Sequence, residues 1–143
     1  MKKEELMIGD WVYNTHNGKP ERVEEIGSGL VMLDYNDLYE YDEIEPIPLT
    51  AEILRDSGLR EDRKDITFRL REYHGDAADY MAIHFSTLSG RPTSIVVEHS
   101  TENMEIRRVD IGGCAYVHEL QHAMRTVGIE KEIIVNENWT DRR

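Results

Sequence analysis

The clearest chemical pattern in this chain lies near its C-terminal end and reads His118-Glu119-Leu120-Gln121-His122. It fits the pattern H-E-x-x-H, in which two histidines one helical turn apart bind zinc. The glutamate between them then activates a zinc-bound water for hydrolysis. On this pattern His118 and His122 would be metal ligands, and Glu119 would be the general base of a zinc hydrolase.

The pattern lies on the helix that the sequence predicts most strongly. Apolar residues recur at spacings of three and four along it, Gly112-Gly113 breaks the structure before it, and Gly128 follows where a C-terminal cap belongs. We therefore predict a helix over residues 114–127. At about 100° per residue, His118 and His122 share the polar side of this helix and point away from its apolar stripe.

A catalytic zinc also needs a third protein ligand, and the helix does not supply one. The extended form of the pattern requires glycine at position 125 and histidine at 128, where this chain has Arg125 and Gly128. A third ligand would have to come from a second subunit or from the N-terminal part of the chain, for instance from His16, Asp34 or Asp37. We therefore favour no metal and no cofactor. The histidine pair is then either exposed or covered by the N-terminal part, and a zinc hydrolase is the alternative.

Composition predicts a cytoplasmic protein. The chain has 143 residues and a single cysteine, Cys114, which excludes an internal disulfide. No stretch approaches the roughly 20 apolar residues of a membrane span. The residues after Met1 are charged and do not form the apolar core of a signal peptide.

The negative charge argues against nucleic acid as a partner. The net charge is −12, and the first 50 residues hold 12 acidic and four basic residues, a net charge of −8. Binding to nucleic acid needs a basic surface. The acidity is typical of a protein that stays soluble, and attraction of a basic partner is the alternative interpretation.

Residues 1–49 predict a small SH3-like β-barrel. Short β-type segments at 11–13, 22–26, 30–33 and 39–44 alternate with turn clusters. Aromatic residues concentrate here, and surface aromatics of such barrels can hold peptides. We take the following residues as a candidate partner surface: Trp11, Tyr13, Tyr35, Tyr39 and Tyr41.

Residues 50–143 predict an α+β domain. A proline-containing strap over 45–49 leads to Thr50, which caps a short helix over 51–57. Segments at 66–71, 80–85, 94–98 and 104–109 predict an antiparallel meander. The helix over 114–127 would cover its apolar face, followed by a final strand over 132–135 and a loose tail.

Three stretches carry a resemblance to a known family. They are Ile8-Gly9-Asp10-Trp11-Val12, the strap Glu43-Ile44-Glu45-Pro46-Ile47-Pro48-Leu49-Thr50, and Tyr116-Val117-His118-Glu119-Leu120-Gln121-His122. Together they resemble a family of uncharacterised small proteins from gut bacteria and their phages and mobile elements. That family has no known activity, and its helix pattern is better written Y-V-H-x-L-Q, without the glutamate or second histidine. The resemblance therefore implies no catalytic residues, and we expect a non-enzymatic interaction or accessory protein with an unidentified protein partner.

Overall fold

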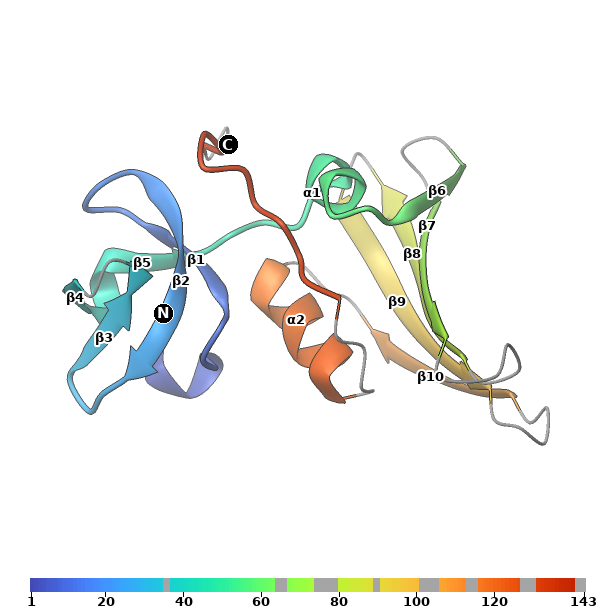
Figure 1. Ribbon diagram of the computed structural model, residues 1–143, viewed down its shortest axis with the longest axis horizontal. Helices are drawn as coiled ribbons and strands as arrows, with labels where there is room; N and C mark the ends of the chain where they lie inside the picture. The colour runs from blue at the N-terminus through green and yellow to red at the C-terminus, as the bar shows by residue number, and fades with distance from the viewer. Residues whose placement is uncertain are drawn as a thin grey trace.

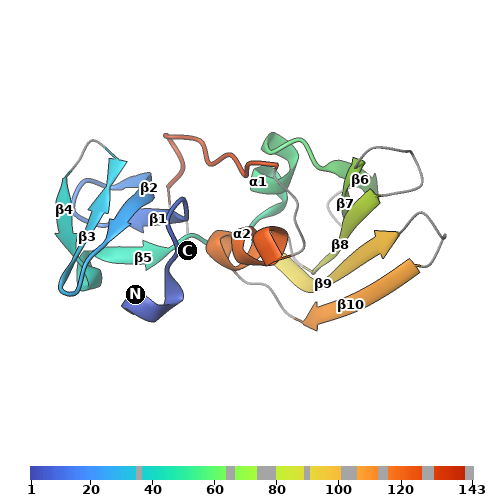
Figure 2. The ribbon, with the colours of Figure 1, turned by 60° about the horizontal axis from the view of Figure 1, so that its bottom comes forward.

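The computed structural model describes the backbone of residues 1–34, 37–63, 67–73, 80–88, 91–100, 106–112, 116–126 and 131–140. Side chains are described for 1–34, 37–61, 116–126 and 131–140. Tyr35, Cys114 and the ends of the predicted helix at 114–115 and 127 lie outside these ranges. Two β-sheets lie at opposite ends of the molecule, with helices α1 (Ala51–Asp56) and α2 (Val117–Thr126) between them (Figures 1 and 2).

The N-terminal sheet has five short antiparallel strands. They are β1 (Trp11–Asn14), β2 (Lys19–Ile26), β3 (Leu30–Leu33), β4 (Leu38–Glu40) and β5 (Ile44–Pro46). Their order is β4-β3-β2-β1-β5, so the sheet is not closed and β4 and β5 form its edges. A 3₁₀ turn, η3 (Tyr41–Glu43), joins the two edge strands.

Buried and exposed side chains alternate along these strands, and the buried ones form the first core. In β3, Val31 and Leu33 are buried, whereas Leu30 is exposed and Met32 half-buried. Successive side chains of a strand point to opposite faces, so one face of β3 lies inside and the other outside. The inner faces of the sheet and the N-terminal segment form one cluster: Leu6, Val12, Val23, Val31, Leu33 and Ile44.

The second sheet confirms the predicted antiparallel meander and adds a strand to it. It contains β6 (Arg60–Arg63), β7 (Thr67–Tyr73), β8 (Tyr80–Leu88), β9 (Arg91–Ser100) and β10 (Ile106–Gly112). The order β10-β9-β8-β7-β6 follows the sequence, as in a meander. An antiparallel sheet together with helices confirms the predicted α+β class.

The second core joins segments that are distant in sequence. The strap binds α2 directly, since Val117 N donates to Ile47 O at 2.9 Å and Pro48 bridges to Tyr116. Helix α1 starts at Thr50, whose hydroxyl accepts from Ile53 N as predicted. The cluster draws on the strap, both helices and the C-terminal segment: Ile47, Leu49, Ala51, Ile53, Leu54, Leu59, Val117, Leu120, Met124, Ile133 and Val135.

The predicted final strand over 132–135 is wrong. Ile133 and Val135 are buried, but the segment 131–136 is irregular and crosses the strap (Figure 1). Its backbone forms hydrogen bonds with side chains and not with a neighbouring strand. Trp11 Nε1 donates to Ile133 O at 2.7 Å, and Ile134 N donates to Ser57 Oγ at 2.9 Å. The tail is not loose up to Trp139, whose ring meets Tyr13 edge-on at 5.5 Å.

The helices in the described part of the chain are too short or too polar to cross a membrane.

Candidate functional site

The polar side of α2 packs against the turn that precedes β1. Asp10 in this turn is 0% exposed, and its Oδ2 lies 2.6 Å from His122 Nε2. Arg125 Nη1 donates to Oδ1 at 3.0 Å, and Met7 N donates to Oδ2 at 2.8 Å. We call Asp10, Met7, His122 and Arg125 the Asp10 junction. It links the N-terminal sheet to the helix by charge-assisted hydrogen bonds, which are stronger than neutral ones.

Gln121 adds a second link between the same two elements. Its Oε1 accepts from Trp11 N at 2.8 Å, and its Nε2 donates to Gly9 O at 3.0 Å. Gly9 has a φ of +91°, and a Cβ there would lie 3.0 Å from Arg125 Nη2. The positive φ therefore favours glycine here, and a Cβ would also press on the end of the Arg125 side chain.

His118 is buried and not exposed on the surface of the helix. It is 7% exposed, its ring stacks on Tyr116 at 5.9 Å, and it meets His122 edge-on at 5.6 Å. Its Nδ1 is buried without a hydrogen-bond partner. Burial lowers the pKa of His118 below its usual 6.5, although Asp10 opposes this effect. His118 is therefore neutral at pH 7.

Glu119 binds the backbone at the start of the helix. It is exposed, and its Oε1 accepts from Tyr116 N at 3.1 Å, which caps the first turn of α2. Among the residues with described side chains, no three His, Cys, Asp or Glu residues are arranged to hold a metal ion. The acid that reaches the histidines is Asp10. Of the candidates predicted for this role, His16 lies near Glu43 at 3.8 Å and Asp34 accepts from Arg22 N.

The predicted aromatic surface is largely engaged within the chain. Trp11 binds Ile133 O and lies under the Arg22 guanidinium, 4.8 Å from the ring centre. The remaining described aromatics are half-buried against the two cores: Tyr13, Tyr39 and Tyr41. Tyr41 also donates to Gly27 O at 2.6 Å, which fixes the turn between β2 and β3.

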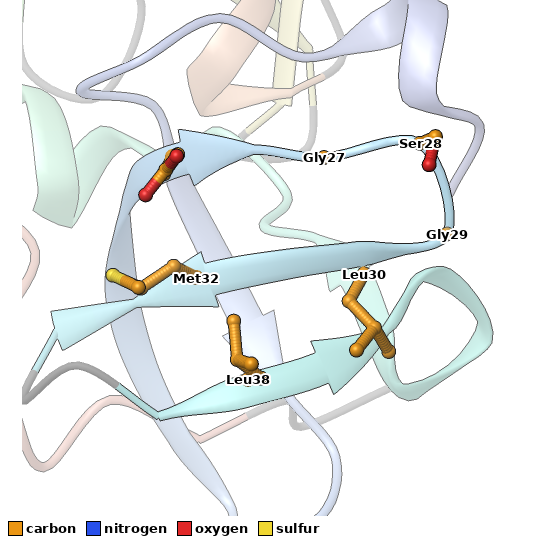
Figure 3. A pocket seen from close by; sticks show the side chains of 7 residues that line it. Gly27, Ser28, Gly29, Leu30, Met32 and Leu38 are labelled. Atoms are coloured by element: carbon orange, nitrogen blue, oxygen red, sulfur yellow. The ribbon is translucent and has the colours of Figure 1, made fainter.

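The outer face of β3 and β4 carries a groove that the sequence reasoning missed (Figure 3). Its volume is about 430 Å³, and it is lined by Glu25, Gly27, Ser28, Gly29, Leu30, Met32 and Leu38. Leu30 is 41% exposed and Leu38 57%. We call this the β3–β4 groove. Its signal in the sequence is the run L-V-M-L at 30–33, which is apolar even at the positions where a half-buried strand carries polar residues.

Acidic residues border this groove. Glu25 pairs with Met32 across β2 and β3, and Glu40 pairs with Leu30 across β3 and β4. Both glutamates are exposed, and Glu25 has no ion pair among the residues with described side chains. The described residues that line the groove include no Lys or Arg. The groove is thus an apolar surface with an acidic border.

We expect the free energy of unfolding to decrease as the pH falls below about 6.5, because His118 is buried. Its pKa is lowered in the folded state, mainly by burial, so the unfolded chain binds the proton more readily. Its contribution is complete above about pH 6.5 and is lost as the pH falls below that value. Asp10, Glu119 and Glu5 weaken the effect and His122 strengthens it.

Urea unfolding between pH 7.5 and 5 measures how the free energy of unfolding changes with pH, and His118→Gln should reduce this pH dependence. The exposed His16→Gln control should keep it, and an equal slope in both variants contradicts the assignment.

Comparison with known proteins finds no matching family model, no matching curated protein and no matching solved structure. The resemblance based on the strap and the helix pattern therefore stays a prediction.

Proposed function

We propose that this protein is a non-enzymatic interaction protein that binds a segment of a protein partner in the β3–β4 groove. The observation that carries this proposal is the pair of exposed leucines beside half-buried Met32 on one outer sheet face. Each of these side chains loses contact with water when a partner covers it, which favours association. A concave apolar surface with a few polar groups at its border is the common form of a binding site.

We also infer that the N-terminal sheet is an SH3-like unit. Two features support this: β5 pairs with β1 and not with its sequence neighbour β4, and a 3₁₀ turn separates β4 from β5. In this proposal helix α2 has a structural role, since it fixes the position of this unit through the hydrogen bonds of the Asp10 junction. A cytoplasmic location belongs to the same proposal and rests on the single cysteine.

A zinc hydrolase is the alternative function, and the observed contacts do not favour it. Glu119 would have to leave the helix cap to reach a zinc-bound water. Asp10, the acid nearest to His122, already binds Arg125 and the backbone of Met7. Among the residues with described side chains, the unpartnered Nδ1 of His118 suits a metal, and a single nitrogen does not make a catalytic site.

Panning of a random peptide library against the immobilised protein tests the proposed function. We expect enrichment of peptides with apolar residues, and loss of that enrichment with the double variant Leu30→Asn/Leu38→Asn. Ile134→Asn is the matched control, because Ile134 is 51% exposed but lies outside the groove. Enrichment that survives the double variant, or none with the unaltered protein, contradicts the proposal.

A further inference from the structure

We propose that the partner segment is extended and basic, that it pairs with β4 as an additional strand, and that its side chains reach Leu38 at the rim of the β3–β4 groove. This inference rests on the proposed function and names the chemistry of the partner. It combines the free edge of β4, the order of side chains across the sheet, and the charge around the groove.

Some backbone N–H and C=O groups of β4 point away from β3, toward the position that an added strand would take. Leu33 N donates to Asp37 O at 3.1 Å, which places Asp37 in a hydrogen-bonded pair with β3. Hydrogen-bonding positions alternate along an antiparallel strand, so the backbone of Tyr39 also faces β3. The N–H and C=O groups of Leu38 and Glu40 therefore point to the open edge. Glu40 N already donates to Glu43 Oε2 at 2.8 Å, so the groups left for a partner strand are the N–H and C=O of Leu38 and the C=O of Glu40.

β4 carries no lysine, proline or bulge of the kind that keeps an edge strand from pairing with another chain, and its short length limits a partner to a few main-chain hydrogen bonds. β4 reads Leu38-Tyr39-Glu40 and pairs with β3 without a register shift. An edge of this kind binds a partner strand by main-chain hydrogen bonds, while its side chains select the sequence.

Side-chain order across the sheet predicts the sequence of the partner. On the outer face, one row runs Glu25, Met32, Leu38, and the next row runs Leu30, Glu40. An added strand places one side chain beside Leu38 and another, two residues away, beside Glu40. Neighbouring side chains on one face of a sheet interact, apolar with apolar and opposite charges with each other. The partner should therefore carry an apolar residue and a Lys or Arg separated by one residue.

The charge of the surroundings supports a basic partner. Glu25 and Glu40 are exposed on the outer face beside the groove, and the first 50 residues have a net charge of −8. Such a field speeds the approach of a basic segment, and like charges disfavour an acidic one. The same field gives selectivity without any additional contact.

Synthetic peptides titrated into the unaltered ¹⁵N-labelled protein test this inference. The probes are nine-residue threonine peptides with leucine and lysine at the fourth and sixth positions, in both orders because either strand direction is open. We expect the leucine–lysine peptide to bind about fivefold or more tightly than its leucine–glutamate counterpart at low salt. Glu40→Lys should reverse this preference, with Glu24→Lys, an exposed change at a residue that does not line the groove, as control.

A second probe tests strand pairing without altering the protein. A leucine–lysine peptide whose backbone nitrogens are methylated on the side facing β4 should lose binding, because it cannot donate to the edge. Equal binding of the lysine, glutamate and methylated peptides overturns the inference, although shifts at Leu30 and Leu38 would then still support the proposed function. No shift in the groove with these peptides or with panned ones overturns both.

Discussion

Replacement of Asp10 by alanine is expected to lower the free energy of unfolding by about 2–4 kcal/mol. The carboxylate is 0% exposed and receives hydrogen bonds from Met7 N and Arg125, with His122 Nε2 at 2.6 Å. A hydrogen bond to a charged group contributes about 1.5–3 kcal/mol. Arg125 and His122 are partly exposed and regain water after the substitution, so the loss is smaller than the sum of the contacts.

Urea unfolding at pH 7.5 measures this loss, with Asp37→Ala as the matched control. Asp37 is exposed, and its replacement should change stability by less than about 0.5 kcal/mol. A double-mutant cycle with Arg125→Ala then isolates the energy that couples the turn to the helix. If Asp10→Ala is as stable as Asp37→Ala, the Asp10 junction does not hold the two parts together.

Replacement of Leu120 by alanine is expected to cost about 2–5 kcal/mol, the usual range for a buried leucine. Leu120 is 0% exposed and belongs to the core that joins α2 to the strap and the C-terminal segment. The cavity left behind would be bordered by segments from three parts of the chain, which cannot all move inward together. Thermal and urea unfolding measure the effect.

Leu38→Ala is the informative comparison for this core variant. Leu38 is 57% exposed, so the same substitution removes little buried surface and should cost less than about 0.5 kcal/mol. A leucine that contributes little to folding, beside a second exposed leucine, suits a binding role. A loss at Leu38 as large as that at Leu120 would mean that the groove belongs to the core.

Local sequence patterns were sufficient for many elements but not for the contacts between them, and the single strand expected over 39–44 is wrong, since β4, η3 and β5 divide this stretch. The alternation along β7 and β8, the turn clusters between β1 and β4, and the apolar spacing of α2 each follow from neighbouring residues. Nothing in the residues next to Asp10 indicates that it contacts the helix. Its partners His122 and Arg125 lie 112 and 115 residues further along the chain, beyond the reach of any local pattern.

The C-terminal segment shows why a correct pattern can still give a wrong element. Ile133 and Val135 alternate with exposed neighbours, as in a strand with one buried face. A strand also needs a neighbour to bind its backbone, and here Trp11 and Ser57 bind it instead. The groove was missed for a related reason. Leu30 and Met32 read as core residues in an apolar run, and only the fold shows that no element covers them in the described part of the chain.

The most direct test of the central claim is a chemical-shift map of a peptide selected by panning, titrated into the ¹⁵N-labelled protein. Our account predicts that the largest shifts fall on Gly27, Leu30, Met32 and Leu38, and that the amides of α2 remain unchanged. Shifts that concentrate on His118, His122 and Asp10 would contradict it, because the binding site would then lie at the Asp10 junction and not in the β3–β4 groove.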